Sequence, residues 1–479
     1  MRFKIGVILL LAITLYSCRE EQLSTDPSLK LTFSKDTVCF DTVFTTIGTS
    51  TLRLMVYNKN ANALSISSIW LDNNTAFKVN VDGENDLTQL KNLQINGGDS
   101  LFVFIKVNID PLKQNNPVLV EDNLHFAVNE KTQTVHLEAV GQDVHLIKTP
   151  ERLTIKNNFT FSAAKPYLIY DTVAVQGKLT IKPGARLYFH DKAALMAYND
   201  VNAVGELQKP IILQGDRTDN IFENVPYAYV AGMWSGFYLV DLKNTDHKTY
   251  KFDCVEILSA NVGLYAFSQK TGFVPSMQLL NSRIHNHAVY GLVLQNINAL
   301  VVNTELSNAA AYCAYLEGGQ HTFIHSTIAS FFNSTDVRIQ SSPREDVAAV
   351  YINNLSKDGV PTHTSFRNCI ITGIRSNNLL VATPFAQYYT DTIANNYIKA
   401  DSLHIANAHN NTYWQKNDSD AFVNTFYKYK EYIYYDFRLA EYSPARGIGD
   451  GSFATKYSTD RLGNPRPTTK PDAGCYQYK

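Results

Sequence analysis

The stretch Leu280-Asn281-Ser282-Arg283-Ile284 recurs twice at a step of 22 residues, as Val302-Asn303-Thr304-Glu305-Leu306 and Ile324-His325-Ser326-Thr327-Ile328. The pattern continues 43 residues later in Arg367-Asn368-Cys369-Ile370-Ile371. It begins 27 residues earlier in Asp253-Cys254-Val255-Glu256-Ile257, one period plus an insertion of five residues. About 22 residues accommodate three short strands and three bends, which make one coil of a parallel β-helix.

Alternation along each repeat predicts which side chains enter the coil. The third and fifth positions should face inward, so the fifth position forms an apolar stack of Ile257, Ile284, Leu306, Ile328 and Ile371. The second position falls at a bend, where the amides of Asn281, Asn303 and Asn368 can bond to the same group one coil away. His325 shares that position. We therefore interpret it as a bend residue, since an acid or base needs partners.

Flanking motifs extend the pattern over residues 150–479. The run from Val173 to Phe189, with Pro210-Ile211-Ile212-Leu213 and Trp234-Ser235-Gly236-Phe237, resembles the opening coils of bacterial surface proteins of the pectin-lyase-like superfamily. From about Asp436 the chain is similar to the closing module of many exported β-helix proteins. The resemblance implies a right-handed parallel β-helix whose C-terminal module caps the last rung, a fold shared by proteins of many activities.

Residues 24–146 show period-two alternation in short runs separated by Asn, Asp and Gly, as at 51–57 and 101–107. Such runs predict half-buried strands of an immunoglobulin-like β-sandwich. The stretch 56–60, with a later Leu-Glu-Ala-Val-Gly at 137–141, resembles the sandwich modules that serve as spacers in cell-surface proteins. Asp82, Glu84 and Asp86 alternate like calcium ligands but lack the rest of that loop pattern, so we expect a solvated turn and no metal.

The N-terminus has the features of a secretory signal. Arg2 and Lys4 precede an apolar run from Ile5 to Tyr16, which is too short to span a bilayer. The sequence Leu15-Tyr16-Ser17-Cys18 resembles the bacterial lipobox, which implies removal of residues 1–17 and acylation of Cys18. Residues 18–23 would form a tether to the outer membrane. An ordinary signal peptide with an incidental cysteine is the alternative.

The acidic pair Glu20-Glu21 after Cys18 is similar to the surface-export signal of Bacteroidetes lipoproteins, which implies display toward the cell exterior. Residues 1–17 hold two of the 43 basic residues and none of the 44 acidic ones, so the mature chain carries a formal net charge of −3. This balance gives no electrostatic basis for binding nucleic acid. The remaining cysteines are odd in number and lack a C-x-x-C pair, which excludes a disulfide framework and a zinc site.

Candidate catalytic residues are few. Glu256, Arg283 and Glu305 fall on one outward column of consecutive coils, and two carboxylates flanking an arginine are suited to acid/base work on a glycosidic bond. The alternative is an exposed ladder of alternating charges, which would let Glu256→Gln and Glu305→Gln leave folding nearly unchanged. Pectate lyases, which the fold resembles, use calcium and a basic residue. A calcium cofactor is therefore expected only if the protein is a lyase.

Aromatic residues near the C-terminal end of the repeats are candidates for glycan binding. Trp414, Tyr427 and Tyr429 lie in a segment dense in Tyr, Asn and Thr, where exposed rings can stack on sugars. The alternative is that they pack over the end of the helix. Two functions follow: a non-catalytic surface module binding glycan or protein, which the lack of an acidic cluster favours, and a lyase or hydrolase acting on acidic glycans.

Overall fold

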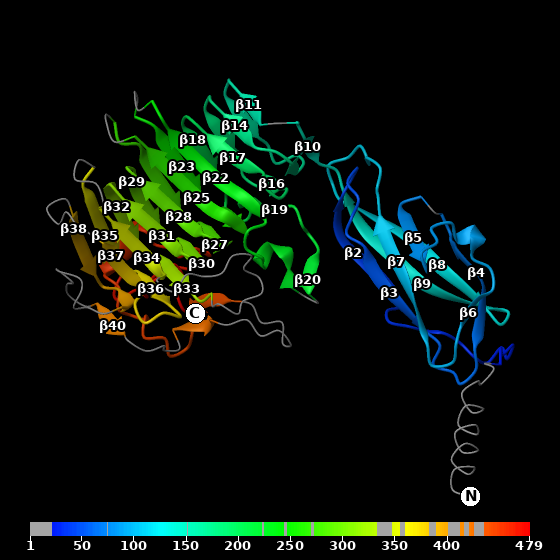
Figure 1. The fold of residues 1–479 in the computed structure, drawn as a ribbon. Helices are drawn as coiled ribbons and strands as arrows, with labels where there is room; N and C mark the ends of the chain where they lie inside the picture. The colour runs from blue at the N-terminus through cyan, green and yellow to red at the C-terminus, as the bar shows by residue number, and fades with distance from the viewer. Residues whose placement is uncertain are drawn as a thin grey trace, which may run out of the picture. The chain divides into compact units, whose positions relative to one another are not determined.

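The computed structural model divides the chain into two compact units, Met1–Asp143 and Val144–Lys479. It describes residues 22–73, 75–150, 152–222, 225–243, 247–269, 273–332, 347–354, 360–382, 389–400, 412–415, 421–425 and 435–479. Strands dominate both units (Figure 1). Helical structure in the described ranges is confined to α2 (Gly451–Lys456), η1 (Leu87–Gln89) and η2 (Tyr227–Tyr229). None of these helices has the length or apolarity needed to cross a membrane.

The first unit is a β-sandwich, as predicted. One sheet has the order β1 (Thr32–Phe33), β3 (Leu52–Tyr57), β7 (Ser100–Val107) and β5 (Phe77–Val81). The other has the order β2 (Thr37–Phe44), β9 (Lys131–Gln142), β8 (Val118–Val128), β4 (Leu64–Leu71) and β6 (Leu93–Ile95). The predicted alternation is confirmed, because Leu54, Val56, Val103 and Ile105 are fully buried between the sheets.

The second unit is a right-handed parallel β-helix with three sheets, named A, B and C here. Sheet A contains β10 (His145–Ile147), β13 (Tyr167–Ile169), β16 (Arg186–Phe189), β19 (Ile211–Gly215), β24 (Val255–Leu258), β27 (Arg283–His287), β30 (Glu305–Ala309), β33 (Thr327–Ser330), β36 (Ile370–Gly373), β39 (Tyr397–Lys399) and β40 (Tyr413–Gln415). Sheet B contains β11 (Leu153–Ile155), β14 (Val173–Val175), β17 (Ala194–Ala197), β22 (Trp234–Asp241), β25 (Ala260–Ser268), β28 (Tyr290–Gln295), β31 (Tyr312–Glu317), β34 (Ala348–Asn353) and β37 (Leu379–Ala382). Sheet C contains β12 (Phe159–Phe161), β15 (Leu179–Ile181), β18 (Val201–Val204), β23 (Thr249–Asp253), β26 (Ser276–Leu280), β29 (Asn298–Val302), β32 (Gly319–Ile324), β35 (Thr362–Arg367) and β38 (Tyr389–Ala394).

The pairing register confirms the 22-residue repeat. Arg283 pairs with Glu305, and Glu305 pairs with Thr327, each one coil further along sheet A. The five-residue insertion lies between β25 and β26, which are separated by seven residues where β28 and β29 are separated by two. The strands on either side of the insertion keep their register with the next coil.

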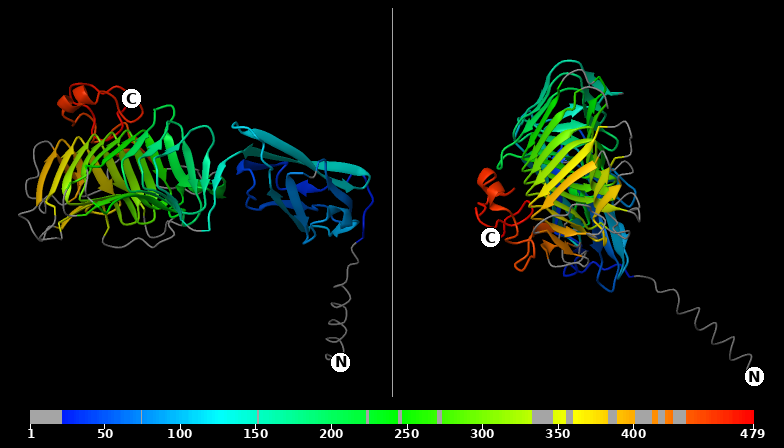
Figure 2. Two further views of the ribbon diagram at one scale, coloured as in Figure 1. Left: turned by 90° about the horizontal axis from the view of Figure 1, so that it is seen from above. Right: turned by 90° about the vertical axis from the view of Figure 1, so that its left-hand side faces the viewer.

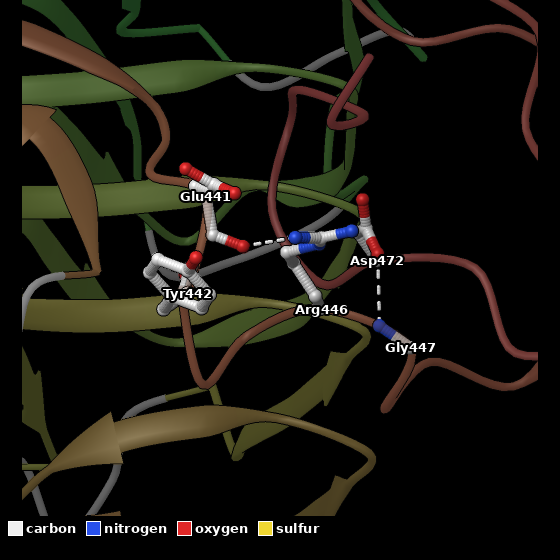
Figure 3. A pocket seen from close by; sticks show the side chains of 6 residues that line it. Glu441, Tyr442, Arg446, Gly447 and Asp472 are labelled. Atoms are coloured by element: carbon white, nitrogen blue, oxygen red, sulfur yellow. Dashed lines mark hydrogen bonds between the residues drawn. The ribbon is translucent and has the colours of Figure 1, made fainter.

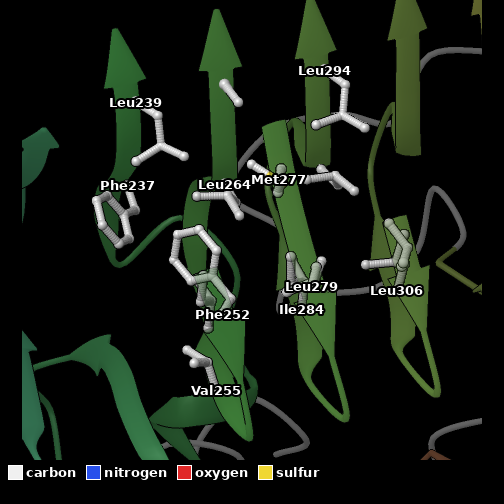
Figure 4. Packing of buried hydrophobic residues seen from close by; sticks show 14 of the residues in the cluster. Phe237, Leu239, Phe252, Val255, Leu264, Met277, Leu279, Ile284, Leu294 and Leu306 are labelled. Atoms are coloured by element: carbon white, nitrogen blue, oxygen red, sulfur yellow. The ribbon is translucent and has the colours of Figure 1, made fainter. Parts of the chain in front are cut away.

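The interior of the coils is a continuous apolar core (Figure 4). The predicted stack of Ile257, Ile284, Leu306, Ile328 and Ile371 is buried, with no member more than 1% exposed. Aromatic residues also stack from coil to coil, since the rings of Phe323 and Phe366 lie 5.0 Å apart at an interplanar angle of 20°. Stacking like residues at the strand spacing satisfies packing in every coil at once.

The bends before the sheet A strands require a left-handed backbone. Cys254, Asn281, Asn303, His325 and Asn368 have φ values between 46° and 55°. Asparagine tolerates this conformation better than most residues. The predicted bond between coils is present, since Asn303 Nδ2 donates to Asn281 Oδ1 at 3.2 Å. His325 therefore occupies a structural bend.

Residues 435–479, called the C-terminal segment below, lie along one side of the coils (Figure 2). Near its start the segment contains β42 (Asp436–Leu439), which pairs with β41 (Phe422–Asn424). A separate two-stranded sheet pairs β20 (Asn220–Phe222) with β21 (Val225–Pro226). Side chains of the C-terminal segment join outward residues of sheet A in a second apolar cluster that includes Ile370, Phe437, Cys475 and Tyr476. The predicted cap thus covers the side of sheet A, whereas we expected it over the last rung.

Candidate functional site

The predicted outward column of charges exists on sheet A. Glu256 pairs with Arg283 and Arg283 with Glu305, so the three side chains lie on neighbouring strands. Arg283 Nε donates to Glu305 Oε1 at 3.0 Å. Ser307 Oγ donates to the same oxygen at 2.6 Å. The structure therefore brings the three residues together as an ion network.

The C-terminal segment covers this column, which corrects our expectation that the ladder is exposed. Tyr476 donates its hydroxyl hydrogen to Glu305 Oε2, and Arg461 Nη2 donates to Glu256 Oε1 at 2.6 Å. The Glu305 side chain is 2% exposed, and that of Glu256 is 27% exposed. The sequence placed the residues correctly on the outer side of the coil. Tyr476 and Arg461, far along the chain, then buried Glu305 and partly covered Glu256.

The electrostatics of the network favour fixed charges. Burial opposes ionisation of Glu305, but the Arg283 and Arg461 guanidinium groups outweigh it and hold the pKa of the Glu305 carboxyl below its usual range. Burial likewise opposes the charge on Arg283, and the Glu305 carboxylate outweighs it and raises the pKa of Arg283. A general acid or base must exchange a proton near working pH with a substrate in reach. A covered and permanently paired carboxylate fits a structural role instead.

The other predicted binding residues lie at the edge of what the structure describes. Trp414 lies within β40, and its side chain is outside the described part. Tyr427, Tyr429 and Cys18 are outside the described residues altogether. Their roles therefore stay predictions.

A face that we did not predict is present on sheet B. Its outward side carries a group of half-buried tyrosines, namely Tyr238, Tyr265, Tyr290, Tyr312, Tyr315 and Tyr351. The rings of Tyr290 and Tyr312 lie 6.0 Å apart at 13°, and those of Tyr312 and Tyr351 lie 4.7 Å apart at 15°. Rings stacked in this way cover one another's faces.

A row of polar side chains runs beside these rings. Gln295 pairs with Glu317, and Glu317 pairs with Asn353, on successive strands of sheet B. Gln295 Nε2 donates to Glu317 Oε2 at 3.0 Å, and the Tyr315 hydroxyl donates to the same oxygen at 2.9 Å. Asn353 Nδ2 donates to the Tyr315 hydroxyl at 2.8 Å. Asn353 is 1% exposed, so we call the six tyrosines with Gln295 and Glu317 the tyrosine face.

Two phenols of the tyrosine face, those of Tyr265 and Tyr315, stay neutral. Burial, followed by the nearby Glu317 carboxylate, raises the pKa of Tyr265, and burial and Glu317 also raise that of Tyr315. Neutral phenols both donate and accept hydrogen bonds. The face therefore combines several tyrosines with the amide of Gln295 and the carboxylate of Glu317.

Sequence alternation could not locate the tyrosine face. Tyr290 recurs at Tyr312 with the 22-residue step, which indicates the repeat but not an exposed face. Tyr312 and Tyr315 are three positions apart, which in a regular strand puts them on opposite faces. Their rings nevertheless lie 6.3 Å apart on one face. The strand is locally irregular between them, with Cys313 and Ala314 both buried.

A shallow surface depression on the C-terminal segment is lined by Glu441, Tyr442, Arg446, Gly447 and Asp472 (Figure 3). Its polar groups bond to one another: Arg446 donates to the Glu441 carbonyl oxygen, and the Gly447 amide donates to Asp472 Oδ1 at 2.8 Å. These contacts hold the segment together. Across the described residues, no group of three or more His, Cys, Asp or Glu side chains is placed to hold a metal ion.

The fold defines the class of protein: a β-sandwich followed by a parallel β-helix. Sheet B of the β-helix carries the tyrosine face. No family model matches the chain, and no curated protein does. Among solved structures, a protein of unknown function from Porphyromonas gingivalis W83 is 14% identical over 26% of this chain and 50% of its own, with a TM-score of 0.19. A family 123 glycoside hydrolase from Clostridium perfringens is 9% identical over 28% and 31%, also with a TM-score of 0.19. Scores this low support neither a family nor an activity.

Proposed function

We propose that the protein is a lipid-anchored surface module that binds a neutral polysaccharide along the tyrosine face without cleaving it. The observation that carries the proposal is the repetition of half-buried tyrosines on neighbouring strands of sheet B, beside Gln295 and Glu317. A polymer of repeated sugars can follow a surface whose donors and acceptors repeat at the strand spacing. Because the stacked rings cover one another's faces, hydrogen bonds to sugar hydroxyls would dominate over stacking of sugars on the rings.

The charge of the tyrosine face favours a neutral glycan over an acidic one. The strands that carry the tyrosine face, β22, β25, β28, β31 and β34, contain no Lys or Arg. An acidic polysaccharide needs cations to offset its carboxylates or sulfates, and Glu317 would repel it. This composition supports a neutral glycan over the acidic substrate of a lyase.

Binding also fits better than catalysis. Hydrolysis of a glycosidic bond uses two carboxyl groups flanking the bond. Glu317 is the carboxylate of the tyrosine face, and its Oε2 already accepts hydrogen bonds from Gln295 and Tyr315. Glu256 and Glu305, the pair found from the sequence, are held by the C-terminal segment.

The binding proposal is tested with the double variant Tyr290→Ala, Tyr312→Ala. We expect affinity electrophoresis in neutral polysaccharides to retard the parent protein and the double variant to bind about ten-fold or more weakly. Tyr442→Ala is the matched control, because Tyr442 is 85% exposed on the C-terminal segment. Equal loss in the control, or a parent that no neutral glycan retards, would contradict the proposal.

Incubating the purified protein with neutral and acidic polysaccharides tests the non-catalytic part of the proposal. They should yield no new reducing ends and no ultraviolet absorbance of an unsaturated product, with or without calcium. Turnover that disappears in Glu317→Gln, Glu256→Gln or Glu305→Gln would replace the binding module by an enzyme.

The anchor is proposed from the lipobox-like sequence at Cys18. Replacing Cys18 by Ser removes the thiol that would be acylated, so we expect loss of metabolic palmitate labelling and release of the protein from membranes. The parent protein expressed in the same cells is the reference. Equal labelling of the Cys18→Ser variant and the parent would rule out the lipid anchor at this position.

A further inference from the structure

The outer face of the four-stranded sandwich sheet carries a pair of exposed phenylalanines. Phe102 and Phe104 on β7 are 43% and 41% exposed, and their rings lie 6.2 Å apart at 8°. Arg53 on β3 places its guanidinium 5.4 Å from the Phe102 ring. Met55 pairs directly with Phe102. Adjacent large apolar residues in the middle of a sheet face, unlike single scattered ones, mark an interaction surface.

The same face is cationic. Lys78 on β5 pairs with Lys106 on β7, and both side chains are exposed, as is that of Arg53. The four strands of this sheet contain no Asp or Glu. The strands of the five-stranded sheet, by contrast, include Asp41 and Glu121, both exposed. The two faces of the sandwich therefore differ in charge, and the face with the phenylalanines is complementary to an anion.

The chain leading to Cys18 is short. The Ser24 amide donates to the Ala63 carbonyl at 2.9 Å, and Leu23 forms a β-bridge with Ala63, which fixes where the chain joins the sandwich. Four residues lie between Cys18 and Leu23, and an extended chain over these five steps spans at most about 18 Å. A lipid on Cys18 would therefore hold the sandwich within reach of the bilayer surface.

We propose that Arg53, Met55, Lys78, Phe102, Phe104 and Lys106, called the basic aromatic face, rest on a bilayer surface with anionic phospholipid headgroups. The two rings enter the interfacial layer while the three cations contact headgroup phosphates. The diacylglycerol that the lipobox resemblance implies at Cys18 would hold the protein at the bilayer, and the basic aromatic face would add a second contact that sets its orientation. The inference extends the proposed lipid anchor and would orient the sandwich on the membrane.

Sedimentation with vesicles tests this face without the lipid, using the protein lacking residues 1–18. We expect it to bind vesicles of mixed phosphatidylglycerol and phosphatidylcholine, and not vesicles of phosphatidylcholine alone. Added salt should weaken binding because the contact is electrostatic. Each cation contributes about five-fold to binding an anionic surface. The variant Lys78→Glu, Lys106→Glu should therefore bind at least about 25-fold more weakly.

Matched controls come from the opposite sheet. Lys131→Glu changes an exposed lysine on β9, and Trp70→Ser changes an aromatic that is 38% exposed on β4. Both should bind like the parent, whereas Phe102→Ser with Phe104→Ser should bind about ten-fold more weakly or worse. Absence of binding by the parent, equal binding to both vesicle types, or equal loss in the controls would each overturn the proposal.

Two further outcomes distinguish the membrane contact from self-association of the chain and from the lipid anchor at Cys18. If the phenylalanine variant turns a dimer into a monomer and leaves vesicle binding unchanged, the face joins copies of the chain and the proposal is wrong. Loss of palmitate labelling in Cys18→Ser concerns the anchor alone, because the vesicle assay uses a protein without residues 1–18.

Discussion

Glu305 is an outward strand residue that is nevertheless buried, because Tyr476 and other residues of the C-terminal segment pack over it. An exposed ion pair contributes little to stability, whereas an unpaired buried charge is costly. The two carboxylates that flank Arg283 therefore differ in their exposure to solvent. Glu256 is partly open to solvent, and Glu305 depends on its partners for every bond.

We predict that Glu305→Ala destabilises the β-helix by about 3–5 kcal/mol, since it leaves Arg283 covered without its carboxylate. Thermal denaturation followed by circular dichroism measures the change. Glu206→Ala is the control, because its pair with Lys209 spans 3.9 Å between side chains that are more than half exposed. The double variant Glu305→Ala, Arg283→Met should recover part of the loss. A melting temperature of Glu305→Ala equal to the parent's would contradict the buried network and restore the original expectation of an exposed ladder.

At the scale of an element, each coil depends on its bend. Asn303 combines a left-handed backbone, φ 49°, with side-chain bonds both along the helix and to the C-terminal segment. Its Nδ2 donates to the Thr459 carbonyl at 2.8 Å, and its Oδ1 accepts from Arg466 Nη2 at 3.1 Å. The bend residues therefore shape the coil and also attach the segment that covers sheet A.

Two substitutions at Asn303 separate these contributions. Asn303→Gly keeps the left-handed backbone but loses the side-chain bonds, whereas Asn303→Ala loses both. Because a non-glycine residue in this conformation costs about 1–2 kcal/mol, we expect the alanine variant to be less stable than the glycine variant by about that amount. Urea denaturation of both variants and the parent measures the difference. An alanine variant as stable as the glycine variant would show that the bend is not strained.

For the whole molecule, buried histidines make stability depend on pH. Burial lowers the pKa of His287 to about 3 and that of His321 to about 4. In the unfolded chain a histidine has a pKa near 6.5, so below that pH the unfolded state binds protons that the folded state does not. Stability is therefore fully present above about pH 6.5 and is lost as the pH falls toward 4.

We predict that the free energy of unfolding falls between about pH 6.5 and pH 4 by about 1.4 kcal/mol per pH unit for each buried histidine, and that the melting temperature falls with it. His321→Leu should flatten that slope, since leucine takes no proton. His136→Leu is the control, because His136 is exposed on the sandwich. A pH profile of His321→Leu identical to that of the parent would show that His321 does not contribute to the acid sensitivity.

Local pattern alone determined the repeat, its inward stack and its asparagine bends. Alternation within a strand and the preference of Asn281 and Asn303 for a left-handed backbone act over a few residues, so they are visible in the sequence. The sandwich strands around Leu54 and Val103 follow from the same alternation. These parts of the fold could be predicted because the forces that set them are short in range along the chain.

Only the tertiary structure decided which outward surfaces are covered. Glu305 became buried because Tyr476 returns from 171 residues further on, and no local pattern encodes that return. The tyrosine face arose because a strand irregularity turned Tyr312 and Tyr315 to one side. Burial of an outward residue depends on what packs over it, and that depends on contacts between segments distant in sequence. The sites therefore had to be found in the folded chain.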